Sequence, residues 1–268
     1  MKYILHNLDI EVTRRCNLRC EHCMRGESQN ININKDYIDV LLDNPEIKQI
    51  DKILFTGGEP TLNPEIIIYT INKIINNNLN VLSLAMVTNG IIYNDELVKA
   101  FYRFNEFRNN KIKKAITKRY INLDKEQVDK ILKDNSKHVR ITFSTDNFHA
   151  PLKDDIKNNY LKYNDNFIIN EFAIEEDEVY QTGLSTYGKE FTYRLKDINY
   201  SSKDNETYTI QGELYLTSTG YLTSEGSGEY NDMDIINLGH INNIKFKDVL
   251  TKYGKPLFGT KEISSKKL

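Results

Sequence analysis

The stretch Leu8-Asp-Ile-Glu-Val-Thr-Arg-Arg-Cys-Asn-Leu-Arg-Cys-Glu-His-Cys23 joins a strand-like run to a short group of cysteines. Cys16, Cys20 and Cys23 have C-x3-C-x2-C spacing, and the chain has 3 cysteines in total. Three thiolates on one loop can bind three corners of a [4Fe–4S] cube, which usually takes four cysteine ligands. Because there is no fourth cysteine, we expect the fourth iron to stay open, as in a catalytic rather than a structural metal site.

The same spacing allows two other interpretations of the cysteines. His22 lies between the last two cysteines and could be the fourth ligand of a zinc ion. However, His22 and Cys23 are adjacent, and zinc loops usually pair C-x2-C with a distant second pair. Disulfides fit poorly, because the cysteine count is odd and no secretory signal precedes the first strand.

Length and charge limit the class of protein. The chain has 268 residues, enough for one large α/β domain or a domain with a small appendage. Its net charge of −2 predicts no nucleic-acid binding through a basic surface. No apolar stretch approaches the ~20 residues of a membrane span, and the N-terminus enters a strand too early for a signal peptide. We therefore expect a cytoplasmic protein with no membrane partner.

Strand-like and helix-like segments alternate over the first two-thirds of the chain. Repeated βα units of this kind predict a parallel sheet, either doubly wound or barrel-like. The expected strands are Leu8–Thr13, Ile50–Thr56, Val81–Val87, Val139–Ser144 and Phe167–Ile174, with a sixth somewhere in Val179–Thr186. The expected helices begin near Asn34, Asn63, Asn94, Asp124 and Pro151.

Unusual residues follow each of the first four strands. In barrels, the chemistry lies on the loops at the carboxyl ends of the strands. We therefore expect these segments to meet at one rim with the cysteine loop: Gly57-Gly58-Glu59-Pro60, Thr88-Asn89-Gly90 and Ser144-Thr145-Asp146.

The pattern changes after about residue 188. Residues 212–224 read as a β-hairpin that turns near Thr219-Gly220, and a short helix is expected from Phe246 to Tyr253. We therefore predict two parts, a core over residues 1–188 and a C-terminal extension over residues 189–268 that packs on the core.

Together, the cysteine spacing and the Gly-Gly-Glu-Pro segment resemble the radical S-adenosylmethionine (SAM) superfamily, over roughly Tyr3 to Thr186. The resemblance implies a partial (β/α)6 TIM-like barrel with one [4Fe–4S] cluster held by Cys16, Cys20 and Cys23. SAM would chelate the open iron. Its reductive cleavage would give methionine and a 5′-deoxyadenosyl radical, which abstracts hydrogen from a substrate. A reductant such as flavodoxin or ferredoxin is implied as a partner.

The resemblance also implies roles for the residues near the cofactor. Gly57 and Gly58 would let backbone approach SAM closely, and Glu59 would accept a charge-assisted hydrogen bond from the methionyl ammonium. His22 would line the adenine side. No residue is assigned to catalysis on the substrate.

Four further residues have two interpretations each. Ser144 and Asp146 would hold the ribose hydroxyls, or they would cap a helix ahead of Pro151. Asn89 would contact the cofactor, or would only tolerate a left-handed turn before Gly90. His149 would touch the substrate or be structural.

The C-terminal part resembles the SPASM or Twitch extensions of this superfamily, which hold auxiliary clusters. This chain departs from them because it has no cysteine after Cys23. The resemblance suggests a peptide substrate, and a small metabolite remains the other option. A non-catalytic electron carrier or redox sensor is the alternative function, but it would not need Glu59 beside Gly57-Gly58.

Overall fold

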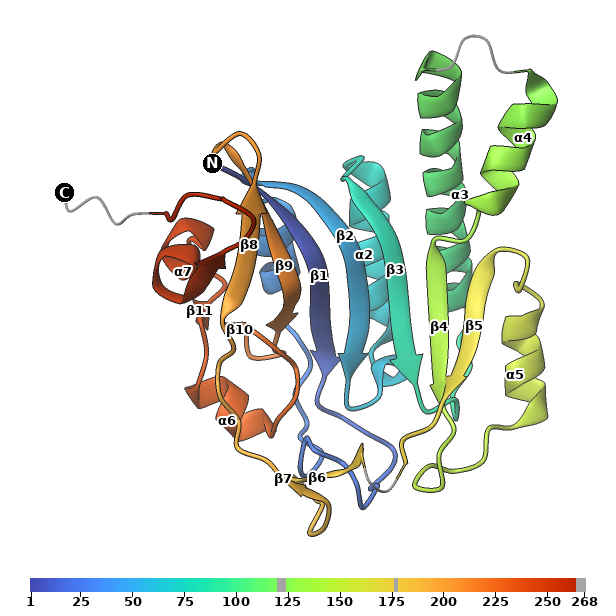
Figure 1. Ribbon diagram of the computed structural model, residues 1–268. Helices are drawn as coiled ribbons and strands as arrows, with labels where there is room; N and C mark the ends of the chain where they lie inside the picture. Colours follow the sequence, from blue (N-terminus) through green and yellow to red (C-terminus); the bar gives the residue numbers. More distant parts are fainter. Residues whose placement is uncertain (120–123, 176–177, 264–268) are drawn as a thin grey trace.

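A ten-stranded mixed sheet forms the centre of the computed structural model, which describes residues 1–119, 124–175 and 178–263 (Figure 1). Five parallel strands lie side by side in chain order. They are β1 (Lys2–Thr13), β2 (Ile47–Gly57), β3 (Val81–Thr88), β4 (Val139–Ser144) and β5 (Phe167–Phe172). The sheet does not close, because β5 ends it on one side. The prediction of an open, barrel-like parallel α/β fold is confirmed.

Helices follow the strands and cover one face of the sheet, where α2 and α3 lie behind it in Figure 1. Between them lies an apolar core that includes Ile10, Phe55, Ile71 and Phe101, all fully buried. The helices are α1 (Lys35–Leu42), α2 (Pro64–Asn76), α3 (Asp95–Arg119), α4 (Lys125–Asp134) and α5 (Asp154–Leu161), with a 3₁₀ turn η1 (Pro60–Leu62) before α2. None of the described helices has both the length and the apolar character needed to cross a membrane.

The helix starts follow the local sequence. Asn34 caps α1 by accepting from the Asp36 amide, and Asp124 forms a capping box with Gln127 at the start of α4. Asn63 instead donates its side-chain amide to the Val12 carbonyl at 2.8 Å. The start of α2 is therefore tied to the end of β1.

The expected sixth strand does not join the main sheet. Its segment contains only the two-residue strand β6 (Tyr180–Gln181), which pairs with β7 (Lys189–Glu190) in a separate small sheet. The six-unit expectation is therefore wrong by one strand, although the class of fold is right.

The C-terminal residues extend the main sheet from its β1 edge. Strand β9 (Thr207–Leu216) runs parallel to β1, with Leu214 opposite Leu8. Strand β10 (Tyr221–Thr223) pairs antiparallel with β9, which confirms the predicted hairpin. The remaining elements are β8 (Ile198–Ser202), α6 (Tyr230–Ile235), β11 (Gly239–His240), α7 (Phe246–Tyr253) and β12 (Gly254–Pro256).

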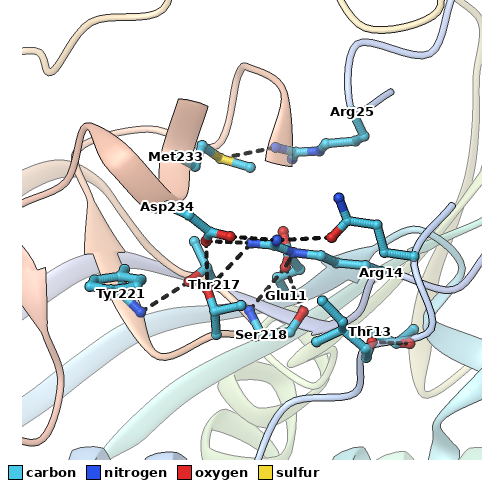
Figure 2. A network of polar contacts seen from close by, with 12 residues as sticks. Glu11, Thr13, Arg14, Arg25, Thr217, Ser218, Tyr221, Met233 and Asp234 are labelled. Atoms are coloured by element: carbon cyan, nitrogen blue, oxygen red, sulfur yellow. Dashed lines mark hydrogen bonds and ion pairs between the residues drawn. The ribbon is translucent and has the colours of Figure 1, made fainter. Parts of the chain in front are cut away.

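A buried ionic network joins this extension to the end of β1 (Figure 2). The Arg14 guanidinium donates to Glu11 at 2.7 Å and to both carboxylate oxygens of Asp234, at 2.6 and 2.7 Å. Glu11 also accepts from the Ser218 amide at 2.9 Å and the Tyr215 hydroxyl at 3.0 Å. Burial by itself lowers the pKa of Arg14, but the hydrogen bonds and charges of Asp234 and Glu11 outweigh it and raise that pKa above its ordinary value.

We expect Asp234→Ala to destabilise the protein by about 2 kcal/mol, because it removes a two-fold charged hydrogen bond and leaves the buried Arg14 with Glu11 as its one charged partner. Chemical denaturation measures the loss. The matched control is Asp232→Ala on the same helix, whose carboxylate makes no hydrogen bond in the described structure and should cost a few tenths of a kcal/mol. Equal effects of the two substitutions would contradict the role given to the network.

Candidate functional site

A cavity of about 280 Å³ lies at the carboxyl ends of the parallel strands. We call it the rim cavity. Its lining includes all but one of the residues predicted to bind the cluster or SAM, together with His149: Cys16, Cys20, His22, Cys23, Gly57, Gly58, Glu59, Asn89, Ser144 and His149. The exception is Asp146, whose carboxylate contacts His149 from outside the lining. The cavity thus gathers these residues, while the roles predicted for them stay predictions.

The three cysteine thiols are free and partly exposed. They line both the rim cavity and a second cavity of about 360 Å³ on the other side of their loop. The loop is fixed by hydrogen bonds from the Cys16 amide to Ser28 Oγ at 2.9 Å and from the Leu18 amide to Cys16 Sγ at 3.4 Å. Three accessible sulfurs on one loop are a suitable donor set for an iron–sulfur cluster.

Burial controls the protonation of these thiols. It raises the pKa of Cys16, and it raises the pKa of Cys20 to about 12, with further contributions from the neighbouring thiols. At neutral pH both groups are therefore protonated in the metal-free protein. Metal binding must release these protons, since the thiolate is the ligand.

The loop after β2 packs backbone against backbone on the residues before Cys16. The Gly58 amide donates to the Thr13 carbonyl and the Glu59 amide donates to the Arg15 carbonyl, each at 2.8 Å. A Cβ atom on Gly58 would lie 2.3 Å from the Arg15 oxygen, and one on Gly57 would lie 2.2 Å from the Thr13 oxygen. The two glycines are thus required for contact between the first two loops, beyond any contact with a cofactor.

Glu59 connects the second and third loops. Its Oε1 accepts from the Thr61 amide at 3.0 Å, and from the hydroxyls of Thr61 and Thr88 at 2.6 and 2.8 Å. Its Oε2 accepts from the Asn89 amide at 2.8 Å. A carboxylate oxygen offers two lone pairs, so Oε2 can accept one more hydrogen bond from a ligand in the rim cavity.

Asn89 connects the third loop back to the cysteine loop. Its side-chain amide donates to Asn17 Oδ1 at 2.8 Å, and its own oxygen accepts from the Ile91 amide at 3.1 Å. Sequence reasoning missed Asn17, Thr61 and Thr88 as supports of this site. In the sequence, the only indication of this supporting role was that these residues lie within or beside the motifs.

Asp146 orients His149. Its Oδ1 accepts from His149 Nδ1 at 2.6 Å and from the Phe148 amide at 3.0 Å. Burial raises the pKa of Asp146, but the hydrogen bond and charge of His149 and the backbone amides outweigh it, so that pKa is lowered. The N-cap of α5 is Lys153, so neither Ser144 nor Asp146 caps that helix.

His22 packs against the same group. Its ring lies 4.5 Å from that of Phe148 and 5.0 Å from that of His149, measured between centroids. Its Nδ1 is buried and has no hydrogen-bond partner among the residues that the structure describes, and burial lowers the pKa of the ring. His22 therefore presents a neutral imidazole at the cavity, with one buried nitrogen that a ligand could satisfy.

The zinc alternative finds no support in this arrangement. Among the described residues, the potential metal ligands that lie within 4.8 Å of one another are His22, Asp146 and His149, without any cysteine. A zinc ion bound by three thiolates and His22 would need all four atoms at about 2.0–2.3 Å from one point. The His22 trio could hold a cation, but the hydrogen bond between Asp146 and His149 already engages two of its atoms.

Comparison with known proteins finds the same family that the motifs resemble. Residues 10–108 match the profile of the Radical SAM superfamily. A GTP 3′,8-cyclase of Clostridium acetobutylicum is 44% identical over 91 residues, which are 32% of this chain and 27% of that protein. A tungsten-containing aldehyde ferredoxin oxidoreductase cofactor-modifying protein of Pyrococcus furiosus is 31% identical over 105 residues, 37% of this chain and 27% of that protein. The chain thus spans about a quarter of the length of these two relatives.

Two solved structures match most of this chain at low similarity. The chain described as anSMEcpe with bound AdoMet gives a TM-score of 0.47 and 15% identity, with 92% of this chain and 80% of that chain covered. Streptococcus suis SuiB bound to its precursor peptide SuiA gives a TM-score of 0.42 and 14% identity, with 94% and 65% covered. Neither likeness is close enough to carry an argument about function.

We expect Gly58→Ala to lose most of its iron, because the added methyl group must displace the backbone of Arg15 beside Cys16. Iron and sulfide per chain after anaerobic reconstitution measure the effect. Gly212→Ala is the control, since it strains a backbone with φ of +87° by about 1 kcal/mol but has no atom within 4 Å of the new Cβ. If Gly58→Ala loads as much iron as the control, the close contact does not position the cysteines.

Proposed function

We propose that this chain, whose residues 10–108 match the Radical SAM superfamily, is an enzyme of that superfamily that holds one [4Fe–4S] cluster and cleaves SAM reductively. The observation that carries the proposal is the shared lining of the rim cavity. The three cysteines and the Gly57-Gly58-Glu59 segment reach it from different loops. An electron carrier would need the cysteines but no second loop placed for an ammonium group.

The residues that line the rim cavity fit both the cluster and SAM. Cys16, Cys20 and Cys23 supply three thiolates, which leaves one iron of a cube without a protein ligand. Glu59 keeps acceptor capacity on Oε2 for the SAM ammonium. When bound, the cluster supplies the electron that cleaves SAM to methionine and a 5′-deoxyadenosyl radical.

The rest of the lining would hold the adenosine part. His22 offers its ring and its unpartnered Nδ1, and Ser144 has a hydroxyl at the cavity wall that makes no hydrogen bond in the described structure. Asp146 is engaged by His149 and two backbone amides. We therefore assign the ribose contact to Ser144 first, with Asp146 acting mainly by positioning His149.

The proposed reaction also needs a substrate. We infer that the radical abstracts hydrogen from a small molecule or a peptide. The relatives named as cyclases of GTP support a small molecule, and a peptide stays the option that the resemblance suggests. Flavodoxin or ferredoxin would supply the electron in the cytoplasm.

Reconstituted protein should bind about four irons and, with dithionite, convert SAM slowly to 5′-deoxyadenosine. Cys16→Ala, Cys20→Ala and Cys23→Ala should each lose both properties, because each removes an iron ligand. Iron analysis and chromatography of the nucleoside product are the measurements. Glu21→Ala, an exposed change in the same loop, should keep both. Full iron loading of the triple cysteine variant would refute the assignment, and a stable cluster without SAM cleavage would favour the electron-transfer alternative.

Glu59→Gln should weaken SAM binding by roughly 10- to 100-fold, because a charged hydrogen bond of about 1.5–3 kcal/mol becomes a neutral one. Binding is measured on cluster-loaded protein by equilibrium dialysis. Glu65→Gln changes an exposed acid at the start of α2 and should leave the affinity unchanged. If both variants bind SAM like the parent, Glu59 serves only to join the second and third loops.

A further inference from the structure

We propose that a third cavity, on the open face of the sheet, binds a phosphate group of the substrate. This basic cavity has a volume of about 380 Å³ and includes Lys52 on β2, Ser83 on β3, and Arg140 and Thr142 on β4. The inference rests on the proposed function and narrows its substrate to a phosphate-bearing small molecule.

The basic cavity adjoins the rim cavity along the same strands. Val87 lines both of them. Lys52 lies four residues before Thr56 on β2, and Arg140 lies four residues before Ser144 on β4, where Thr56 and Ser144 line the rim cavity. At about 3.3 Å per residue, the two sites are about 13 Å apart along the sheet. One molecule the size of a nucleotide or sugar phosphate can reach both.

The charges of the basic cavity are mostly unpaired. Lys52 and Arg140 form no ion pair among the described residues, and Lys137 at the edge donates to the carbonyl of Asn164 at 2.5 Å. Lys52 lies opposite Ser83 and Arg140 lies opposite Ala85, so two strand spacings and an offset of two residues separate their backbones by about 12 Å. Both side chains are long enough to converge on one group between them.

The nearby titratable groups leave this positive charge in place. Asp9 on β1 lies close enough to Lys52 to interact, but burial and the charge of Glu213 raise the pKa of Asp9 to about 7. Both effects favour the protonated form of Asp9, which weakens its neutralisation of Lys52. His138 in the cavity wall is neutral, because burial and Arg108 lower its pKa to about 4.

The composition favours phosphate over other ligands. An arginine offers two parallel donors that match phosphate oxygens, and lysines add point charges. Three cations in one cavity exceed what a single carboxylate needs, whereas a diphosphate or triphosphate carries enough charge to balance them. An uncharged or basic peptide segment would leave them unsatisfied.

The test is binding of inorganic pyrophosphate to the cluster-loaded protein, measured by calorimetry. Lys52→Met with Arg140→Met should weaken binding about 100-fold, since each cation accounts for roughly a tenfold change or more. The control is Lys113→Met with Lys130→Met, which removes the same charge from exposed positions on α3 and α4 and should bind pyrophosphate like the parent.

Three outcomes overturn the inference: no binding of pyrophosphate to the parent protein, equal binding by the two double variants, or succinate binding as tightly as pyrophosphate. The last would show a site that selects charge without selecting phosphate. SAM cleavage without substrate is measured on the same samples. It should be unchanged in the Lys52/Arg140 variant, so failure of phosphate binding and failure of the proposed function give different results.

Discussion

The backbone contact between Gly58-Glu59 and Thr13–Arg15 is the constraint on which the site depends. Two hydrogen bonds of 2.8 Å hold it, and there is no room for a side chain at either glycine. Because Arg15 precedes Cys16 and Glu59 follows Gly58, one contact sets both the cysteine loop and the carboxylate. The distance between metal ligands and the proposed ammonium acceptor is therefore fixed by backbone rather than by flexible side chains.

Glu59 and Asn89 join the third loop to the first two loops by hydrogen bonds. A buried carboxylate that accepts four hydrogen bonds from protein groups is held before any ligand arrives. Asn89 then returns to the cysteine loop through Asn17. The three loops thus form a closed set of contacts. A site organised in this way loses little conformational entropy on binding, which is the physical advantage of preorganisation.

Local patterns in the sequence were enough to predict the five parallel strands, the C-terminal hairpin and ten of the residues that line the rim cavity. These patterns did not predict the features that depend on contacts between residues far apart in the sequence. The segment expected to be a sixth strand instead supports the cysteine loop: the Leu184 amide donates to the Cys23 carbonyl at 2.8 Å, and a Cβ on Gly183 would lie 2.4 Å from the same oxygen. The pairing of Arg14 with Asp234 joins residues 220 positions apart, and no local pattern contains it.

The attachment of the C-terminal extension does not use a metal bound by cysteine. Without a cysteine after Cys23, it must be held by other forces. Strand pairing of β9 with β1 and the buried Arg14 network supply them. The likeness to a SPASM or Twitch extension stays a prediction. Because the extension attaches beside β1, it leaves the face of β2, β3 and β4 free, with the rim cavity at one end and the basic cavity further along. The position of the extension therefore leaves accessible the surface on which a substrate could span both cavities.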